Sequence, residues 1–291
     1  MLNRIACTCL AAISLAGCAS IEKPFMYEIE KDGTKSYLLG SLHEGVSAKE
    51  FPPWVYEKID QSNALVTEID PSKNNFGDTD SLLYLPKGTP TLDQRVSPKV
   101  WNELVYYRND VTVERLRGMR PLAAAVQYVK GRAAAGDRIR SWRIDSGKMD
   151  RELRTYAASK GKVLGFLEKD PLTDGRTGPC AYVIESELLE NFVLETMSGK
   201  QTENPEIFAD AYRKGDVAAL NHQDFGDEKG KECLFRYRQL GWIFEIEQNQ
   251  RALAPVVYVV GAKHLYVEKD SLPQMLEEKG FKVRRLEAPA K

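Results

Sequence analysis

Two of the three histidines in the chain follow the same short pattern: an apolar run, a glycine and, three residues after the glycine, a histidine. His43 stands in the stretch SYLLGSLHEGV and His264 in VVYVVGAKHLYV, whereas His222 lies in a polar stretch typical of a solvated loop. A single histidine after a strand is more often structural than a ligand, but the repeated context favours a site shared by His43 and His264. The glycine of each pattern would let the backbone approach that site closely.

Two glutamates occupy comparable positions at the ends of apolar runs. Glu68 lies near the end of ALVTEID, and Glu168 closes KVLGFLE. If these runs are parallel strands, the two glutamates and two histidines meet at the carboxyl edge of the sheet, where α/β proteins bind ligands. Two imidazoles and two carboxylates can hold a divalent metal such as manganese, cobalt or zinc. The sequence therefore predicts a metal site, although each glutamate by itself also fits a salt bridge at a strand end.

Helix and strand patterns alternate along much of the chain. A helical pattern is followed by a strand pattern in residues 51–70, 149–168 and 270–286, with Gly161 and Gly280 at the expected ends of the last two helices. The middle is more helical, with apolar residues at helical spacing in SPKVWNELVYYRND, RPLAAAVQYVKGRAAAG, ESELLENFVLETM, NPEIFADAYRKGD and ECLFRYRQLGWIFEIEQ. These patterns predict an α/β fold: a central, largely parallel sheet of strand-helix-strand units, flanked by helices, with a helical middle insertion.

The composition limits the class of protein. A chain of 291 residues with 43% hydrophobic and 29% charged residues is ordinary globular material. We expect a single domain over residues 27–291, because no low-complexity linker divides this part of the chain. The formal net charge is -1, and there is no long run of lysine or arginine. The sequence therefore argues against nucleic acid as a partner.

The first residues have the pattern of a secretory signal. The apolar segment 5–16 is too short to span a bilayer, and it leads into LAGC, which resembles the bacterial lipobox. We expect residues 1–17 to be removed, Cys18 to carry acyl chains such as palmitate, and residues 18–26 to form an anchor linker. The alternative is an ordinary signal peptide with an incidental Cys18. No aspartate resembling an inner-membrane retention signal follows Cys18, so the predicted location is the periplasmic face of the outer membrane.

Export changes the interpretation of the remaining cysteines. After signal removal and acylation of Cys18, Cys180 and Cys233 are the only free thiols, and they lie in an oxidising compartment. They either form a disulfide bond or are two unrelated buried thiols. The sequence leaves both readings open.

Several motifs resemble, in chain order, those of the TraB/GumN family, the bacterial relatives of the Tiki metalloproteases. They are YLLGSLH with LVTEID, RPLAAA, RIDSGKMDRELRTYAASKGKVLGFLE, YRKGD, RYRQLGW and VVYVVGAKHLYVEKDSLPQMLEEKGFKVRRL. The resemblance spans nearly all of the mature chain, and its most specific part is the pair of G-x-x-H elements with an early glutamate. It implies an α/β fold shared with erythromycin-esterase-like and haem-binding ChaN-like proteins, and a manganese- or cobalt-dependent peptidase activity as in the Tiki branch.

The resemblance also implies a role for individual residues. By this resemblance, His43 and His264 are the histidines of the two motifs, and Glu68 is the early carboxylate. Glu168 matches the glutamate of the central LE motif, and Arg238 matches the arginine of the late helix.

The chain departs from the family pattern beside the predicted crevice. The family's late RN pair is Arg238-Gln239 here, Arg143 replaces the usual glycine before ID, and residues 266–268 replace a glycine-rich turn. The choice of substrate therefore does not carry over from the family.

Together these features predict a periplasm-facing lipoprotein that uses a divalent metal to hydrolyse a peptide or another small-molecule substrate. His43, His264 and one or both glutamates would hold the metal; a glutamate that is not a ligand would act as general base, and Arg238 would stabilise the oxyanion. One alternative is a non-catalytic module that binds a peptide or haem, with a histidine as axial ligand. The other is a metal-independent, esterase-like hydrolase with His43 as the base.

The lipid anchor leads to a first prediction. Cys18→Ser removes the only residue that the lipobox pattern offers for acylation, so the variant should remain an unprocessed or soluble precursor and should lose partitioning into detergent. Membrane fractionation and the mass of the N-terminus measure this. Normal cleavage together with unchanged membrane association would contradict the lipoprotein assignment.

Overall fold

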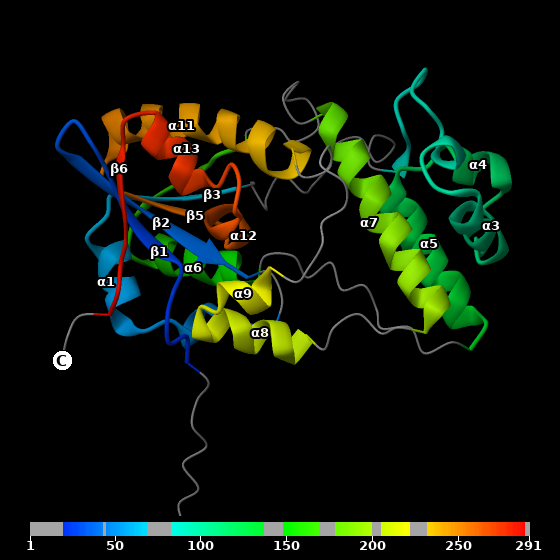
Figure 1. The fold of residues 1–291 in the computed structure, drawn as a ribbon, viewed down its shortest axis with the longest axis horizontal. Coiled ribbons are helices and arrows are strands. Elements are labelled where there is room, and N and C mark those ends of the chain that lie inside the picture. Colours follow the sequence, from blue (N-terminus) through cyan, green and yellow to red (C-terminus); the bar gives the residue numbers. More distant parts are fainter. Residues whose placement is uncertain are drawn as a thin grey trace, which may run out of the picture.

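The computed structural model describes residues 20–42, 45–68, 83–136, 148–168, 178–199, 205–221 and 232–288, with the backbone alone for 178–184, 205–206 and 232–234. Its centre is a six-stranded mixed sheet with the strand order β4-β3-β5-β2-β1-β6 (Figure 1). Neighbouring strands among the first four are parallel: β4 (Val163–Phe166), β3 (Ala64–Thr67), β5 (Val256–Gly261) and β2 (Thr34–Ser41). The predicted α/β class with a largely parallel sheet is confirmed.

Two antiparallel strands extend this sheet on one side. β1 (Met26–Lys31) pairs with β2, and β6 (Lys282–Arg285) pairs with β1. The β1–β2 connection is the pair Asp32-Gly33, with φ angles of 52° and 76°, as expected of a tight hairpin turn whose two central residues both need positive φ. Sequence analysis predicted the strand that becomes β6 but did not identify β1, although the Asp-Gly pair was a usable hairpin signal.

The register of the parallel strands brings their carboxyl ends to one edge. β2 and β5 end in register with each other, and Thr67 of β3 lies opposite Phe166 of β4. The pairing continues beyond both strands, because the Glu168 N–H donates to the Glu68 carbonyl oxygen at 2.8 Å. Residues that follow these strands therefore emerge close together, at the edge where parallel sheets bind ligands.

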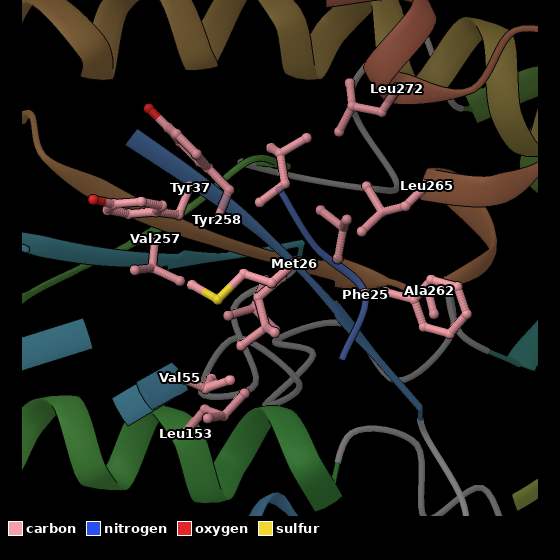
Figure 2. Close-up of a cluster of buried hydrophobic side chains, with 14 of the residues drawn as sticks. Phe25, Met26, Tyr37, Val55, Leu153, Val257, Tyr258, Ala262, Leu265 and Leu272 are labelled. Carbon is pink, nitrogen blue, oxygen red and sulfur yellow. The ribbon is translucent and has the colours of Figure 1, made fainter. Parts of the chain in front are cut away.

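Helices cover both faces of the sheet. α1 (Pro53–Asp60) and α6 (Lys148–Ser159) lie on one face, and α11 (Arg238–Leu253) and α13 (Leu272–Glu278) lie on the other (Figure 1). The main hydrophobic core fills the space between these layers, and side chains of β1, β2 and β5 meet side chains of the covering helices there (Figure 2). Because β5 is central and covered on both sides, its run of valines and tyrosine is fully buried.

Several short elements complete the chain. They are η1 (Ala48–Glu50), η2 (Leu92–Gln94), the π-helical turn η3 (Glu232–Tyr237) and the single-turn helix α12 (Lys263–Tyr266). As predicted, α6 and α13 end just before Gly161 and Gly280, which have φ angles of 69° and 83°. These two glycines adopt a conformation that residues with a side chain rarely take.

The predicted helical middle insertion builds a second hydrophobic cluster, separate from the main core. It consists of α3 (Pro98–Tyr106), α4 (Val113–Gly118), α5 (Pro121–Ala134) and α7 (Gly178–Ser198), which lie to one side of the sheet in Figure 1. The following α8 (Pro205–Lys214) and α9 (Val217–Leu220) return to the main core. The assignment of one domain to residues 27–291 stays a prediction. Among the described residues, no helix has both the length and the apolar character needed to cross a bilayer.

Gly40 shows why a glycine precedes the end of β2. A Cβ atom at this position would lie 2.8 Å from the Phe25 Cβ and 3.0 Å from the Ala262 Cα. Such distances are too short for a methyl group, so the glycine allows the chain that follows β5 to pack directly against β2.

Gly40→Ala should therefore destabilise the protein. Overpacking at a buried contact of this kind costs about 1–3 kcal/mol of unfolding free energy. The matched control is Gly118→Ala, where the nearest atom of the described residues to the new methyl group is a Tyr84 ring carbon at 3.7 Å. The change in unfolding free energy there should stay within about 0.5 kcal/mol. Urea denaturation compares the two variants, and equal midpoints would refute this account of Gly40.

Candidate active site

Three of the candidate side chains lie together at the carboxyl edge of the sheet. Glu68 directly follows β3, and Glu168 lies just beyond the neighbouring strand β4. His264 belongs to α12 and comes three residues after the end of β5. All three residues are buried, with exposed fractions of 7%, 4% and 5%. Burial of this kind is unusual for carboxylates unless a partner compensates their charge.

The partner is Arg238, the first residue of α11. Its Nε donates to Glu168 Oε1 at 2.8 Å, and its Nη2 donates to Glu68 Oε2 at 2.8 Å. Its remaining nitrogen, Nη1, lies 3.4 Å from His264 Nε2. One guanidinium therefore joins two carboxylates from different strands to the imidazole that follows a third strand, through charge-assisted hydrogen bonds.

The electrostatics of this cluster hold Arg238 in its charged form. Burial by itself would lower the pKa of Arg238, but the adjacent carboxylates of Glu168 and Glu68 outweigh it and raise that pKa above its ordinary value. The guanidinium consequently acts as a permanent positive charge between the two glutamates. With His264 neutral, two carboxylates and one arginine leave the cluster with a formal charge of -1.

Glu68 also contacts the strand that leads to His264. Its Oε1 accepts a hydrogen bond from the Gly261 N–H at 2.5 Å and lies 3.9 Å from His264 Nε2. The glycine of the second histidine pattern thus donates its backbone N–H to a site carboxylate. Glu68 is held from both sides, by Arg238 through one oxygen and by the end of β5 through the other.

Two residues of α11 that sequence analysis did not assign to the site support it. Trp242 Nε1 donates to Glu168 Oε1 at 3.0 Å, and the Trp242 ring lies 4.4 Å from the His264 ring, centroid to centroid. Gln239 Oε1 lies 3.3 Å from His264 Nδ1. Trp242 is buried, as is usual for a packing residue, but it is also a hydrogen-bond donor. The usable signal was helical spacing, since positions 238, 239 and 242 share one face of a helix.

The other predicted residues lie outside this description. His43 comes two residues after the end of β2 in the sequence and belongs to the residues that the structure does not describe, as do Cys18 and His222. The backbone positions of Cys180 and Cys233 fall in α7 and η3, and their side chains are outside the described set. The disulfide bond and the role of His43 stay predictions.

Arg238 adds to the cluster an ion bridge that the strand-end patterns did not predict. Glu68 and Glu168 each accept a hydrogen bond from Arg238, which lies between them. Within the described ranges, no group of three or more histidine, cysteine, aspartate or glutamate residues is arranged to hold a metal ion. The arginine could not be placed there from local patterns, because it reaches the site from a helix 70 residues beyond Glu168 in the chain.

The model of the TraB/PrgY/gumN family matches residues 25–285. The chain belongs to this family. The matched region includes every strand of the sheet and the described residues of the cluster around Arg238. No curated protein and no solved structure matches the chain.

The partly buried Arg238 of this TraB/PrgY/gumN family member gives a stability prediction. Arg238→Ala leaves Glu68 and Glu168 buried without their shared cation, which should cost about 3–5 kcal/mol of unfolding free energy near neutral pH. The matched control is Arg236→Ala, two residues away, whose ion pair with Asp270 is exposed and contributes at most about 1 kcal/mol. Chemical denaturation of both variants measures the difference.

Equal losses of unfolding free energy in Arg238→Ala and Arg236→Ala would contradict the bridging role of Arg238.

Proposed function

We propose that this TraB/PrgY/gumN family member is an exported, lipid-anchored hydrolase that cleaves peptides with the help of a divalent metal. The observation that supports it best is the cluster of buried Glu68, Glu168 and His264 around the partly buried Arg238, at the carboxyl edge of the parallel strands. A purely structural ion pair has no need of an adjacent imidazole, and this edge is where α/β proteins bind substrates. Export and anchoring through Cys18 belong to the same proposal.

The described residues fit a metal as a partial set of ligands. His264 Nε2 and Glu68 Oε1 are 3.9 Å apart, and two metal–ligand bonds of about 2.0–2.2 Å each span that distance. The cluster's formal charge of -1 favours a further cation. The contact from Arg238 Nη1 to His264 Nε2 is long, at 3.4 Å, so the imidazole can exchange it for a better partner. The family resemblance offers His43 as a third ligand.

Glu68 and Glu168 would have different roles. A bound manganese, cobalt or zinc ion would supply a water of lowered pKa and would polarise the scissile carbonyl. Glu68 is the carboxylate beside His264, so we assign it to the metal. Glu168 Oε1 accepts hydrogen bonds from Arg238 and Trp242, while its Oε2 accepts none from the described residues. This orientation suits Glu168 to take a proton from the attacking water.

Arg238 would hold the two glutamates in place before the reaction and would stabilise negative charge during it. A guanidinium has five N–H groups, and three of them face Glu68, Glu168 and His264. Its side chain is 18% exposed, more than either glutamate side chain. The remaining N–H groups and the fixed positive charge would stabilise the oxyanion that develops when the carbonyl is attacked.

Metal analysis and peptide cleavage test this proposal on the mature lipoprotein purified in detergent. We expect about one equivalent of manganese, cobalt or zinc after reconstitution, and cleavage of a diverse peptide library only when metal is present. His43→Ala, His264→Ala and Glu68→Gln should lose both metal and cleavage, because each removes a ligand. Glu168→Gln should keep the metal and lose cleavage, because it removes the base. His222→Ala is the matched histidine control and should keep both.

The outcomes also separate the two alternative functions. Cleavage that survives complete removal of metal but is lost in His43→Ala would favour the metal-independent hydrolase. If the wild-type protein binds none of the three metals and cleaves no peptide, the hydrolase is wrong. A haem spectrum that shifts on titration and is lost in His264→Ala or His43→Ala would then favour the binding module.

A further inference from the structure

We propose that Gln239 is a positioning residue that fixes His264 in one tautomer, with the proton on Nδ1 and the lone pair on Nε2. The use of this tautomer rests on the proposed function, in which the Nε2 lone pair would bind a metal or accept a proton. Its structural basis is independent of that function. It consists of the hydrogen bonds that surround the Gln239 side chain.

The orientation of the Gln239 amide is fixed by two acceptors. Gln239 is fully buried, and its Nε2 donates to the Asp270 carbonyl oxygen at 2.5 Å and lies 3.5 Å from the Met275 sulfur. A carbonyl oxygen and a thioether can only accept, so the amide nitrogen must face them. The amide oxygen is therefore the atom that lies 3.3 Å from His264 Nδ1.

This orientation determines where the imidazole carries its proton. Gln239 Oε1 can only accept, so Nδ1 must be the donor of that contact. On the other side of the ring, His264 Nε2 faces Arg238 Nη1 at 3.4 Å, and a guanidinium can only donate. Both neighbours therefore require the same neutral tautomer. An outer hydrogen bond to the second ring nitrogen is the usual way in which proteins orient a metal-binding histidine.

The elements around Gln239 keep this chain of contacts in place. Asp270 has a φ angle of 57°, unusual for a residue other than glycine, and its side chain pairs with Arg236 of η3 at 2.8 Å. The His264 ring itself packs against the rings of Trp242 and Phe235, at centroid distances of 4.4 and 5.1 Å. The imidazole can thus neither tilt away from Gln239 nor rotate without disturbing packed aromatic rings.

Nitrogen NMR of histidine-labelled, metal-free mature protein reads the tautomer directly. The signals of His264 are identified by their loss in His264→Ala, and we expect a protonated Nδ1 and an unprotonated Nε2 in the wild type. Gln239→Met, which keeps the shape but removes the acceptor, should move the proton wholly or partly to Nε2. Gln239→Glu, as the neutral acid, keeps an acceptor towards Nδ1 and a donor towards the Asp270 carbonyl oxygen, so the proton should stay on Nδ1.

The matched control is Gln250→Met, which alters another buried glutamine of α11 whose amide donates to the Thr34 carbonyl oxygen. It should leave the His264 signals unchanged, so that a general loss of stability is distinguished from loss of positioning. Cobalt affinity should fall about 10–100-fold in Gln239→Met and should be maintained in Gln250→Met.

The results separate failure of this inference from failure of the proposed function. A wild-type His264 that carries its proton on Nε2, or an unchanged tautomer in Gln239→Met, would overturn the positioning role whatever the protein binds. If Gln239→Met does not fold, the wild-type and Gln239→Glu spectra still decide the point. The expected tautomers combined with no metal binding would leave the positioning role standing and would remove the metal-dependent hydrolase.

Discussion

The ion bridge from Arg238 to Glu68 and Glu168 is the interaction on which this edge of the protein depends. Two carboxylates from adjacent strands lie buried with little access to water, and a single guanidinium compensates both. The same bridge ties the start of α11 to the ends of β3 and β4. Because bidentate, planar contacts of this kind need an arginine, lysine is a poor substitute at position 238.

The sheet topology makes the bridge possible. The order β4-β3-β5-β2 places the strand that leads to His264 next to the strand that leads to Glu68, with Glu168 on the far side. Parallel register then brings all their carboxyl ends to the same edge. Gly40 and Gly261 serve this arrangement differently: the first allows two chains to pack closely, and the second donates its N–H to Glu68. The paired glycines are therefore not equivalent in function.

Helix α11 organises the site from one side. Arg238, Gln239 and Trp242 lie within one turn of each other and contact, respectively, the carboxylates, the imidazole and both. Gln239 in turn connects the imidazole to the residues before α13 through the Asp270 carbonyl oxygen. A helix is suited to this task because its backbone hydrogen bonds are satisfied internally, which leaves every side chain of one face available for the site.

The sequence by itself determined the class of fold and the placement of Glu68, Glu168 and His264 at strand ends. Strand and helix patterns, and the glycines that follow the helices, are local properties of the chain and can be recognised without the tertiary structure. It could not place Arg238 between the carboxylates or give Gln239 and Trp242 their partners. A helical pattern shows which residues share one face of a helix. It does not show which residues that face contacts, because those contacts depend on the order of the strands in the sheet. The tertiary structure decided these contacts. Burying two carboxylates requires a cation, and Arg238 at the start of α11 provides it at the carboxyl edge of the sheet.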